Sequence, residues 1–118
     1  MNAQVIGRAL DCGGKTVGVA GDNRTERVRF QLDREPDGRM YIKLQPPSGD
    51  PFRSELTVSG TEAVWEVEAA AVASAGTLEC QLMTEDTEYT PPRVWQSERF
   101  SLNVLESLGY EKAETQEV

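Results

Sequence analysis

Apolar and polar residues alternate along most of this chain, and the alternation is clearest between residues 64 and 108. Three segments in this region carry an apolar residue at every second position. A period of two is typical of a β-strand that buries one face. We expect these segments to be three strands on one side of a common core. Their inward positions are Trp65 and Val67, then Leu78, Cys80 and Leu82, then Phe100, Leu102 and Val104.

The amino-terminal half predicts further short strands separated by turn residues. Glycine, proline, asparagine and aspartate punctuate the pattern, since these residues favour turns and interrupt strand ladders. The Gly13-Gly14 pair is such a turn, and the proline-rich stretch at 46–51 is a loop. The expected strands before residue 60 cover residues 5–12, 16–20, 27–33, 40–44 and 52–58.

The segment at 27–33 is the best single strand of this half, with Val28, Phe30 and Leu32 on its inward face. The next apolar segment, residues 40–44, follows the pair Asp37-Gly38. An Asp-Gly pair between two alternating segments is typical of a β-hairpin turn. We therefore expect these two strands to be adjacent and antiparallel.

Helical signal is confined to residues 69–75, which are mostly alanine and too few for a helix that is stable by itself. We expect one helical turn or an irregular crossover there. The last two strands are expected at residues 77–85 and 94–105. About seven or eight strands at this spacing, with no helix to cover a parallel sheet, predict an all-β fold, a two-sheet antiparallel β-sandwich.

The composition is acidic, with 20 Asp and Glu residues against 12 Lys and Arg and a net charge of -8 over 118 residues. Such a field repels phosphate backbones and anionic lipids, so we expect neither nucleic acid nor membrane partners. No signal peptide or membrane-spanning run is recognisable. We expect the β-sandwich domain to occupy residues 1–108, followed by an acidic, flexible tail at 109–118.

Two motifs could in principle carry chemistry, and each has a simpler interpretation. Gly14-Lys15-Thr16 resembles the end of a phosphate-binding loop, but the required earlier glycine is replaced by Ala9 and a strand-like segment follows. The carboxylates at 85, 86 and 88 lack the spacing of a calcium loop and are expected to be solvated. The chain has no histidine to activate a nucleophile. We expect no enzyme activity, no metal and no cofactor.

The two cysteines, Cys12 and Cys80, are too far apart in sequence for a Cys-x-x-Cys motif. Cys80 falls on an apolar face between Leu78 and Leu82, where a free cysteine commonly acts as a small hydrophobic residue. Buried, unreactive thiols are favoured, and a disulfide between the two remains open.

The two tryptophans differ in setting. Trp65 shares an apolar face with Val67 and is expected in the core. Trp95 follows a proline pair and, together with Tyr89, is the candidate for a ligand or interface contact. Amphipathic aromatic side chains can stack on a sugar or anchor a protein contact, although Trp95 could equally cover an edge of the sandwich.

The carboxy-terminal pattern resembles the amino-terminal domain of the baseplate upper protein of tailed phages that infect Gram-positive bacteria. The resemblance is carried by the Trp65-x-Val67 segment, by Gly76-Thr77-Leu78 with Gln81-Leu82, and by Ser97-x-x-Phe100-x-Leu102-x-Val104-x-x-Ser107-Leu108. The earlier strands at 27–33 and 40–44 are compatible with the same layout. The resemblance covers residues from about 5 to 108 and contains no chemical signature.

This resemblance implies an immunoglobulin-like β-sandwich without catalytic activity. It implies a structural protein of a phage or prophage virion, made in the bacterial cytoplasm. Such a domain attaches the host-recognition apparatus to the tail or baseplate, binds other tail and baseplate proteins, and packs as a homo-oligomer. The alternative hypothesis is a carbohydrate-binding or adhesive module that uses Tyr89 and Trp95.

Overall fold

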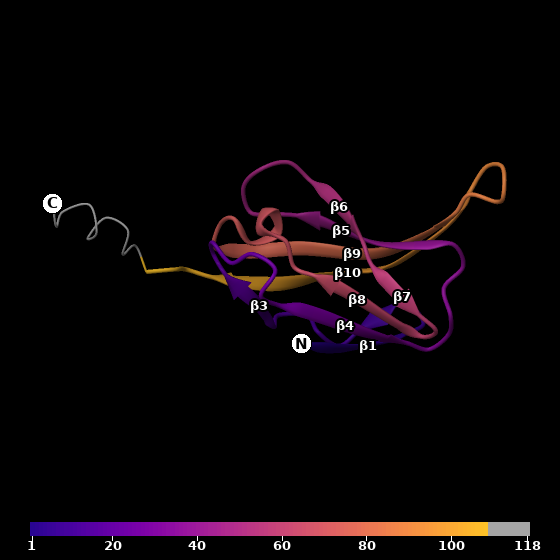
Figure 1. Ribbon diagram of the computed structural model, residues 1–118, viewed down its shortest axis with the longest axis horizontal. Coiled ribbons are helices and arrows are strands. Elements are labelled where there is room, and N and C mark those ends of the chain that lie inside the picture. Colours follow the sequence, from indigo (N-terminus) through magenta and orange to yellow (C-terminus); the bar gives the residue numbers. More distant parts are fainter. Residues whose placement is uncertain (109–118) are drawn as a thin grey trace, which may run out of the picture.

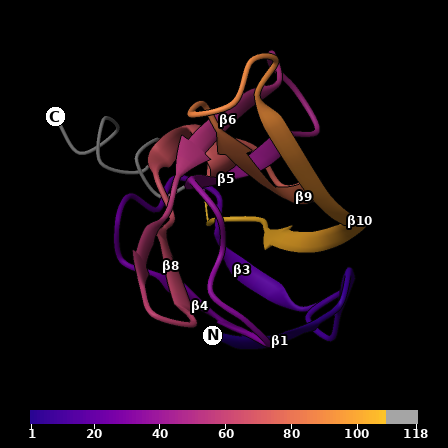
Figure 2. The same cartoon turned by 90° about the vertical axis from the view of Figure 1, so that its right-hand side faces the viewer.

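A computed structural model describes residues 1–108, and the chain forms two five-stranded sheets packed face to face (Figures 1 and 2). The first sheet has the order β2-β1-β4-β8-β7 and the second β3-β10-β9-β5-β6. The strands of the first sheet are β1 (Asn2–Ile6), β2 (Ala9–Leu10), β4 (Arg27–Leu32), β7 (Thr57–Ser59) and β8 (Glu62–Glu66). Those of the second are β3 (Thr16–Val19), β5 (Arg39–Gln45), β6 (Phe52–Glu55), β9 (Gly76–Asp86) and β10 (Arg93–Leu105).

The alternation in the sequence determines which face of each strand is buried. In β4 the buried positions are Val28, Phe30 and Leu32, and in β5 they are Met40, Ile42 and Leu44. The rings of Phe30 and Phe100 meet edge to face with centroids 6.3 Å apart, which joins the two sheets in the middle of the core. The chain is nearly all β, and its two layers are compatible with the predicted sandwich.

The prediction of a purely antiparallel arrangement is wrong, because both sheets are mixed. Strand β1 runs parallel to β4, and β3 runs parallel to β10. The amino-terminal segment forms a β1–β2 hairpin in the first sheet and then crosses to the second, with the fully buried Cys12 at the crossing. Where the chain reaches the second sheet, the Gly14 amide donates a hydrogen bond of 2.7 Å to the Ser101 carbonyl of β10. The number of strands is also higher than expected, with ten among residues 1–108 in place of seven or eight.

The expected hairpin between residues 27–33 and 40–44 is wrong as well. Both strands exist as β4 and β5, but β4 pairs with β1 and β8, whereas β5 pairs with β6 and β9. The segment after β4, which contains Asp37-Gly38, therefore crosses between the sheets. Alternation specifies the buried face of a strand but not its neighbours, and an Asp-Gly turn serves a crossover as well as a hairpin.

The expected strand at residues 52–58 is divided between the two sheets. Strand β6 pairs with β5, and β7 pairs with β8 on the opposite layer. Leu56, between them, is 4 % exposed, and its amide donates to the Met40 carbonyl over 2.9 Å. The buried Leu56 side chain and its backbone hydrogen bond hold the chain at this crossing. One extended segment thereby supplies an edge strand to each of the two sheets.

The three segments from 64 to 108 do not all lie on one side of the core. Trp65 belongs to β8 in the first sheet, while β9 and β10 are antiparallel partners in the second. The expected core position of Trp65 is confirmed, since it is 1 % exposed. The connector contains a 3-10 turn at Ala69–Val72, as expected, and Gly13-Gly14 is a turn that leads into β3. The predicted tail at 109–118 lies outside the described residues.

Candidate functional site

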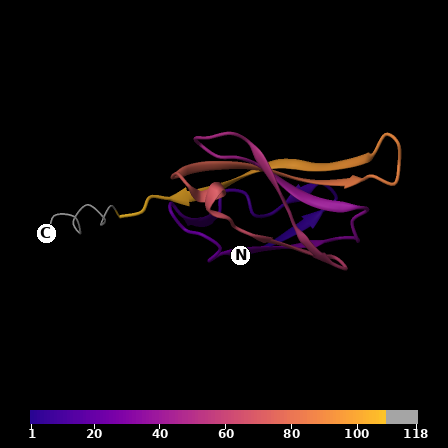
Figure 3. The same cartoon turned by 45° about the horizontal axis from the view of Figure 1, so that its top comes forward.

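The β9–β10 hairpin projects beyond the rest of the two sheets (Figures 1 and 3). These strands have 11 and 13 residues and are the longest of the described chain. Strand β5, which pairs with β9, begins at Arg39, opposite Glu85, so the hairpin continues past the first residue of that strand. Its last described pair is Asp86 with Arg93. We call residues 84–95 the arm.

The arm is held at its base by a close backbone contact from Gly38. This glycine has a φ of +73°, a left-handed conformation that favours glycine. A Cβ at this position would lie 2.3 Å from the carbonyl oxygen of Glu85 and 2.7 Å from the Cα of Asp86. The crossover from β4 to β5 therefore packs backbone against backbone at the point where the arm leaves the sheets.

The tip of the arm carries Tyr89, which is 43 % exposed. The Arg93 guanidinium carbon lies 3.7 Å from the centroid of the Tyr89 ring, a cation–π contact across the loop. The Asp86 carboxylate accepts a hydrogen bond of 3.1 Å from the amide of Glu88 and so orders the start of this loop. Next to Arg93, Val94 is 53 % exposed. The arm thus presents an aromatic ring and an apolar side chain to its surroundings.

Trp95 lies on the same arm but in a different environment. It stands opposite Thr84 and packs, partly buried, against the core between the sheets. With Val5, Leu32 and Met40 it lines a small cavity of about 60 Å³. The Arg8 guanidinium carbon is 5.7 Å from its ring centroid. The two predicted contact residues are thus on one hairpin, with Tyr89 at the exposed tip and Trp95 at the covered base.

A β-bulge fixes the segment that follows Trp95. The register between β9 and β10 shifts between Gln96 and Arg99, and the buried Ser97 hydroxyl accepts a hydrogen bond of 3.0 Å from the Leu82 amide. On the other side of β10, the Glu98 amide donates to the Arg8 carbonyl over 2.9 Å. The Arg8 side chain donates to the Gln96 carbonyl. The bulge therefore ties the base of the arm to the amino-terminal hairpin of the other sheet.

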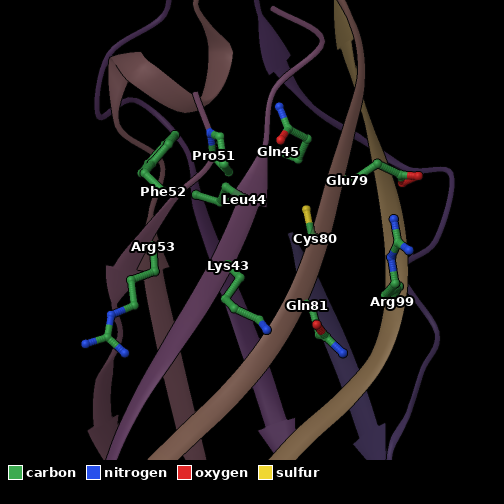
Figure 4. A pocket seen from close by; sticks show the side chains of 10 residues that line it. All are labelled: Lys43, Leu44, Gln45, Pro51, Phe52, Arg53, Glu79, Cys80, Gln81 and Arg99. Carbon is green, nitrogen blue, oxygen red and sulfur yellow. The ribbon is translucent and has the colours of Figure 1, made fainter. Parts of the chain in front are cut away.

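Sequence reasoning missed a second surface feature, a shallow depression of about 400 Å³ on the outer face of the second sheet (Figure 4). Lys43, Gln81 and Arg99 are directly opposite one another on β5, β9 and β10, and Arg53 of β6 stands opposite Lys43. These four side chains form one row across four strands, which we call the basic row. The sequence contains each residue, but only the strand register brings them together.

The remaining chemical motifs have structural roles. Residues 85, 86 and 88 belong to the arm, and Glu85 lies 3.8 Å from Arg53 in an ion pair. Within residues 1–108 no group of three or more His, Cys, Asp or Glu side chains could hold a metal ion. No helix of the described chain is long and apolar enough to cross a membrane.

Cys12 and Cys80 are both buried and both free. Burial is the main cause that raises the pKa of each thiol, because it disfavours the charged thiolate. The neighbouring Asp11 raises the pKa of Cys12 further. Since the thiolate is the reactive species, both groups are poor nucleophiles in the folded protein.

We expect neither thiol to react rapidly with a disulfide reagent such as DTNB at about pH 8, near the pKa of an unperturbed cysteine. Both should react within the mixing time once the chain is unfolded in guanidinium. The native rate should be at least about a hundredfold lower, since reaction must wait for an opening of the core. One fast equivalent in the native protein would contradict the burial of that cysteine, and Cys12→Ser would identify which thiol it is.

No protein-family model and no curated protein sequence matches this chain. The function must therefore be argued from the residues, the fold and the two surface features above.

Proposed function

We propose that this chain is a non-enzymatic structural protein of a phage or prophage virion. In this proposal it is an immunoglobulin-like assembly domain of the tail or baseplate that attaches the host-recognition apparatus. Its partners are other tail and baseplate proteins. The assignment to a phage virion is based on the resemblance, whose motifs lie at residues 64–108. The proposed mode of attachment is based on the arm.

The projecting arm is the observation that carries this proposal. Protein contacts often centre on a few exposed aromatic and apolar side chains supported by a preorganised backbone. Tyr89 and Val94 are exposed on the arm, while Gly38, Ser97 and Arg8 fix its base. Such a ribbon can enter a partner surface at little cost in conformational entropy, because its base is already ordered.

The interior supports the same proposal. The apolar residues of the resemblance lie in the core of the two sheets, including Trp65, Val67, Leu78, Phe100 and Leu102. These residues specify a scaffold and leave the surface free to vary. This is what is expected when related domains share a fold but bind different neighbours.

The test is to purify tails of the phage or prophage whose genome encodes this chain and to quantify the chain by mass spectrometry. We expect it in fixed proportion to the known tail proteins. Tyr89→Ala combined with Val94→Ser should lower its incorporation by at least about tenfold, which corresponds to roughly 1.4 kcal/mol of binding free energy. Ile6→Ser is the matched control, because Ile6 is also an exposed apolar residue, at 70 %, but lies on β1 of the other sheet.

Two results would contradict the proposal. One is the absence of the chain from tails that are otherwise complete. The other is equal incorporation of the arm variant and the Ile6→Ser control. That result would show that the chain attaches to the tail without using the arm.

The carbohydrate-binding alternative remains a prediction without a specific observation in its favour. One face of the Tyr89 ring is covered by Arg93, and Trp95 is packed against the core. A sugar ring stacks on an open aromatic face. Glycan-array binding that is lost in a folded Trp95→Ala variant would favour this alternative.

A further inference from the structure

The basic row is an unusual feature for a chain with a net charge of -8. Arg53 and Lys43 stand directly opposite each other, and Gln81 separates Lys43 from Arg99. Like charges directly opposite on neighbouring strands destabilise a sheet. The row therefore has a cost in the isolated protein that a bound anionic group would remove.

The charges of the row are only partly neutralised within the described chain. Arg53 pairs with Glu85 at 3.8 Å and lies over the Tyr41 ring at 4.0 Å. Lys43 donates to the neutral side-chain amide of Gln96. Neither Lys43 nor Arg99 has a carboxylate within 4.0 Å among residues 1–108. Lys43 and Arg99 are thus the cations available to a ligand.

The shape of the surface fits an extended segment better than a small molecule. The depression is shallow and open, and it lies over the row between Phe52 on one side and Arg99 on the other (Figure 4). Within the described residues, Glu79 is the one carboxylate that lines it, and its side chain accepts a hydrogen bond of 2.7 Å from the Ser101 hydroxyl. Lys43 and Arg99 stand two strand spacings apart, or about 10 Å.

The sequence contains a segment of the complementary charge. Residues 106–118 hold four glutamates and one lysine, and Glu111, Glu114 and Glu117 recur at every third position. Glutamates three positions apart are at most about 11 Å apart along the backbone, which covers the separation of Lys43 and Arg99. This segment therefore has the charge and the spacing to lie across the row.

The row of the same copy is out of reach for most of this segment. Leu108 follows Arg99 by nine positions, which is about 30 Å along an extended chain, and residues 106–108 continue away from the sheets (Figure 1). From Leu108, Glu111 can return by no more than about 11 Å and Glu114 by about 22 Å, so of the three glutamates only Glu117 could reach back as far as Arg99. A second copy has no such restriction.

We propose that the basic row of one copy binds the acidic segment, residues 106–118, of a second copy. The contact is head to tail, so repetition of it leads to a closed ring or an open filament. The proposal goes beyond the attachment function above and does not rest on it, because it uses a different face and needs no phage partner.

The test is sedimentation velocity of the full chain over a range of protein concentrations and at two ionic strengths. We expect reversible self-association that is stronger at about 0.02 M salt than at about 0.5 M, because the contact is electrostatic and close to the surface. Lys43→Glu combined with Arg99→Glu should weaken the association constant by at least about tenfold, since two attractive contacts become repulsive. Lys15→Glu combined with Arg34→Glu makes the same change in net charge at exposed positions elsewhere and should have little effect.

A charge exchange shows whether the row and the segment meet each other. A chain with Glu111→Lys, Glu114→Lys and Glu117→Lys should also fail to self-associate. Mixing it with the Lys43→Glu/Arg99→Glu chain should restore association, because the reversed segment then meets a reversed row. A mixture that stays monomeric, or a wild-type chain that is monomeric at every concentration, overturns the proposal. So does a row variant that associates as well as its control. None of these results depends on detection of the chain in phage tails.

Discussion

Replacing Gly38 by alanine should destabilise the protein by about 3 to 5 kcal/mol, as the sum of a conformational cost and an overpacking cost, and this is the largest effect of any single methyl group added at a described glycine. Two costs add up. The left-handed φ of +73° is unfavourable for any residue with a Cβ, by roughly 1–2 kcal/mol. The new Cβ would also lie 2.3 Å from the Glu85 carbonyl oxygen and 2.7 Å from the Asp86 Cα, and both are backbone atoms that cannot rotate away. Relief requires the crossover and the arm to separate.

The control for this experiment is Gly14→Ala. Gly14 has a φ of +80°, so the conformational cost is matched, but no atom lies within 4 Å of its Cβ position. Urea denaturation of both variants gives the two losses of unfolding free energy. Gly38→Ala should lose at least about 2 kcal/mol more than Gly14→Ala. Equal losses would show that the close contact between Gly38 and the arm is not maintained in solution.

Replacing Trp65 by alanine should cost about 3–5 kcal/mol, the range found for large aromatic residues truncated in a core. Trp65 is 1 % exposed, and its indole N–H donates a hydrogen bond of 3.0 Å to the Glu68 carboxylate. Glu68 also accepts a hydrogen bond from Ser54 on β6 of the opposite sheet. The substitution therefore opens a cavity in one layer and removes one link of a polar bridge to the other.

Trp95→Ala is the matched comparison, since it deletes the same side chain at a partly exposed position. Its loss of unfolding free energy should be smaller than that of Trp65→Ala by at least about 1 kcal/mol, because less apolar surface returns to water. Thermal unfolding followed by circular dichroism ranks the two variants. The opposite order would contradict the placement of Trp65 in the core and of Trp95 at its margin.

The alternating pattern predicted which residues are buried, and it could not predict which strands are neighbours. Residues 27–33 and 40–44 became β4 and β5 with the expected inward faces. Their pairing was wrong because one-face burial is satisfied equally well in either sheet. The same reason explains why one strand was expected at 52–58 where the structure has two. The buried Leu56 continues the alternating pattern at the point where the chain passes from one sheet to the other.

The basic row depends on the register of its strands, and the arm depends on the lengths of β5, β9 and β10. Both are properties of the whole fold. The sequence shows that Tyr89 and Trp95 are aromatic residues near a loop. The projection of the hairpin becomes visible only because β5 begins at Arg39, opposite Glu85. The basic row could not be predicted from the sequence, because Lys43, Arg53 and Arg99 lie on three strands whose relative register the sequence does not give. A shift of one strand by one residue would move its cation to the opposite face.

The parallel pair of β3 and β10 determines when the domain can finish folding during synthesis. Residues 103–105 are the partners of Thr16, Gly18 and Val19, so the second sheet lacks one of its inner strands until residue 105 has left the ribosome. Until then, the edge of β9 that later meets β10 has unpaired amides and carbonyls, and such edges favour aggregation. A newly made chain is therefore most vulnerable just before β10 emerges, when the apolar residues of the other described strands are already outside.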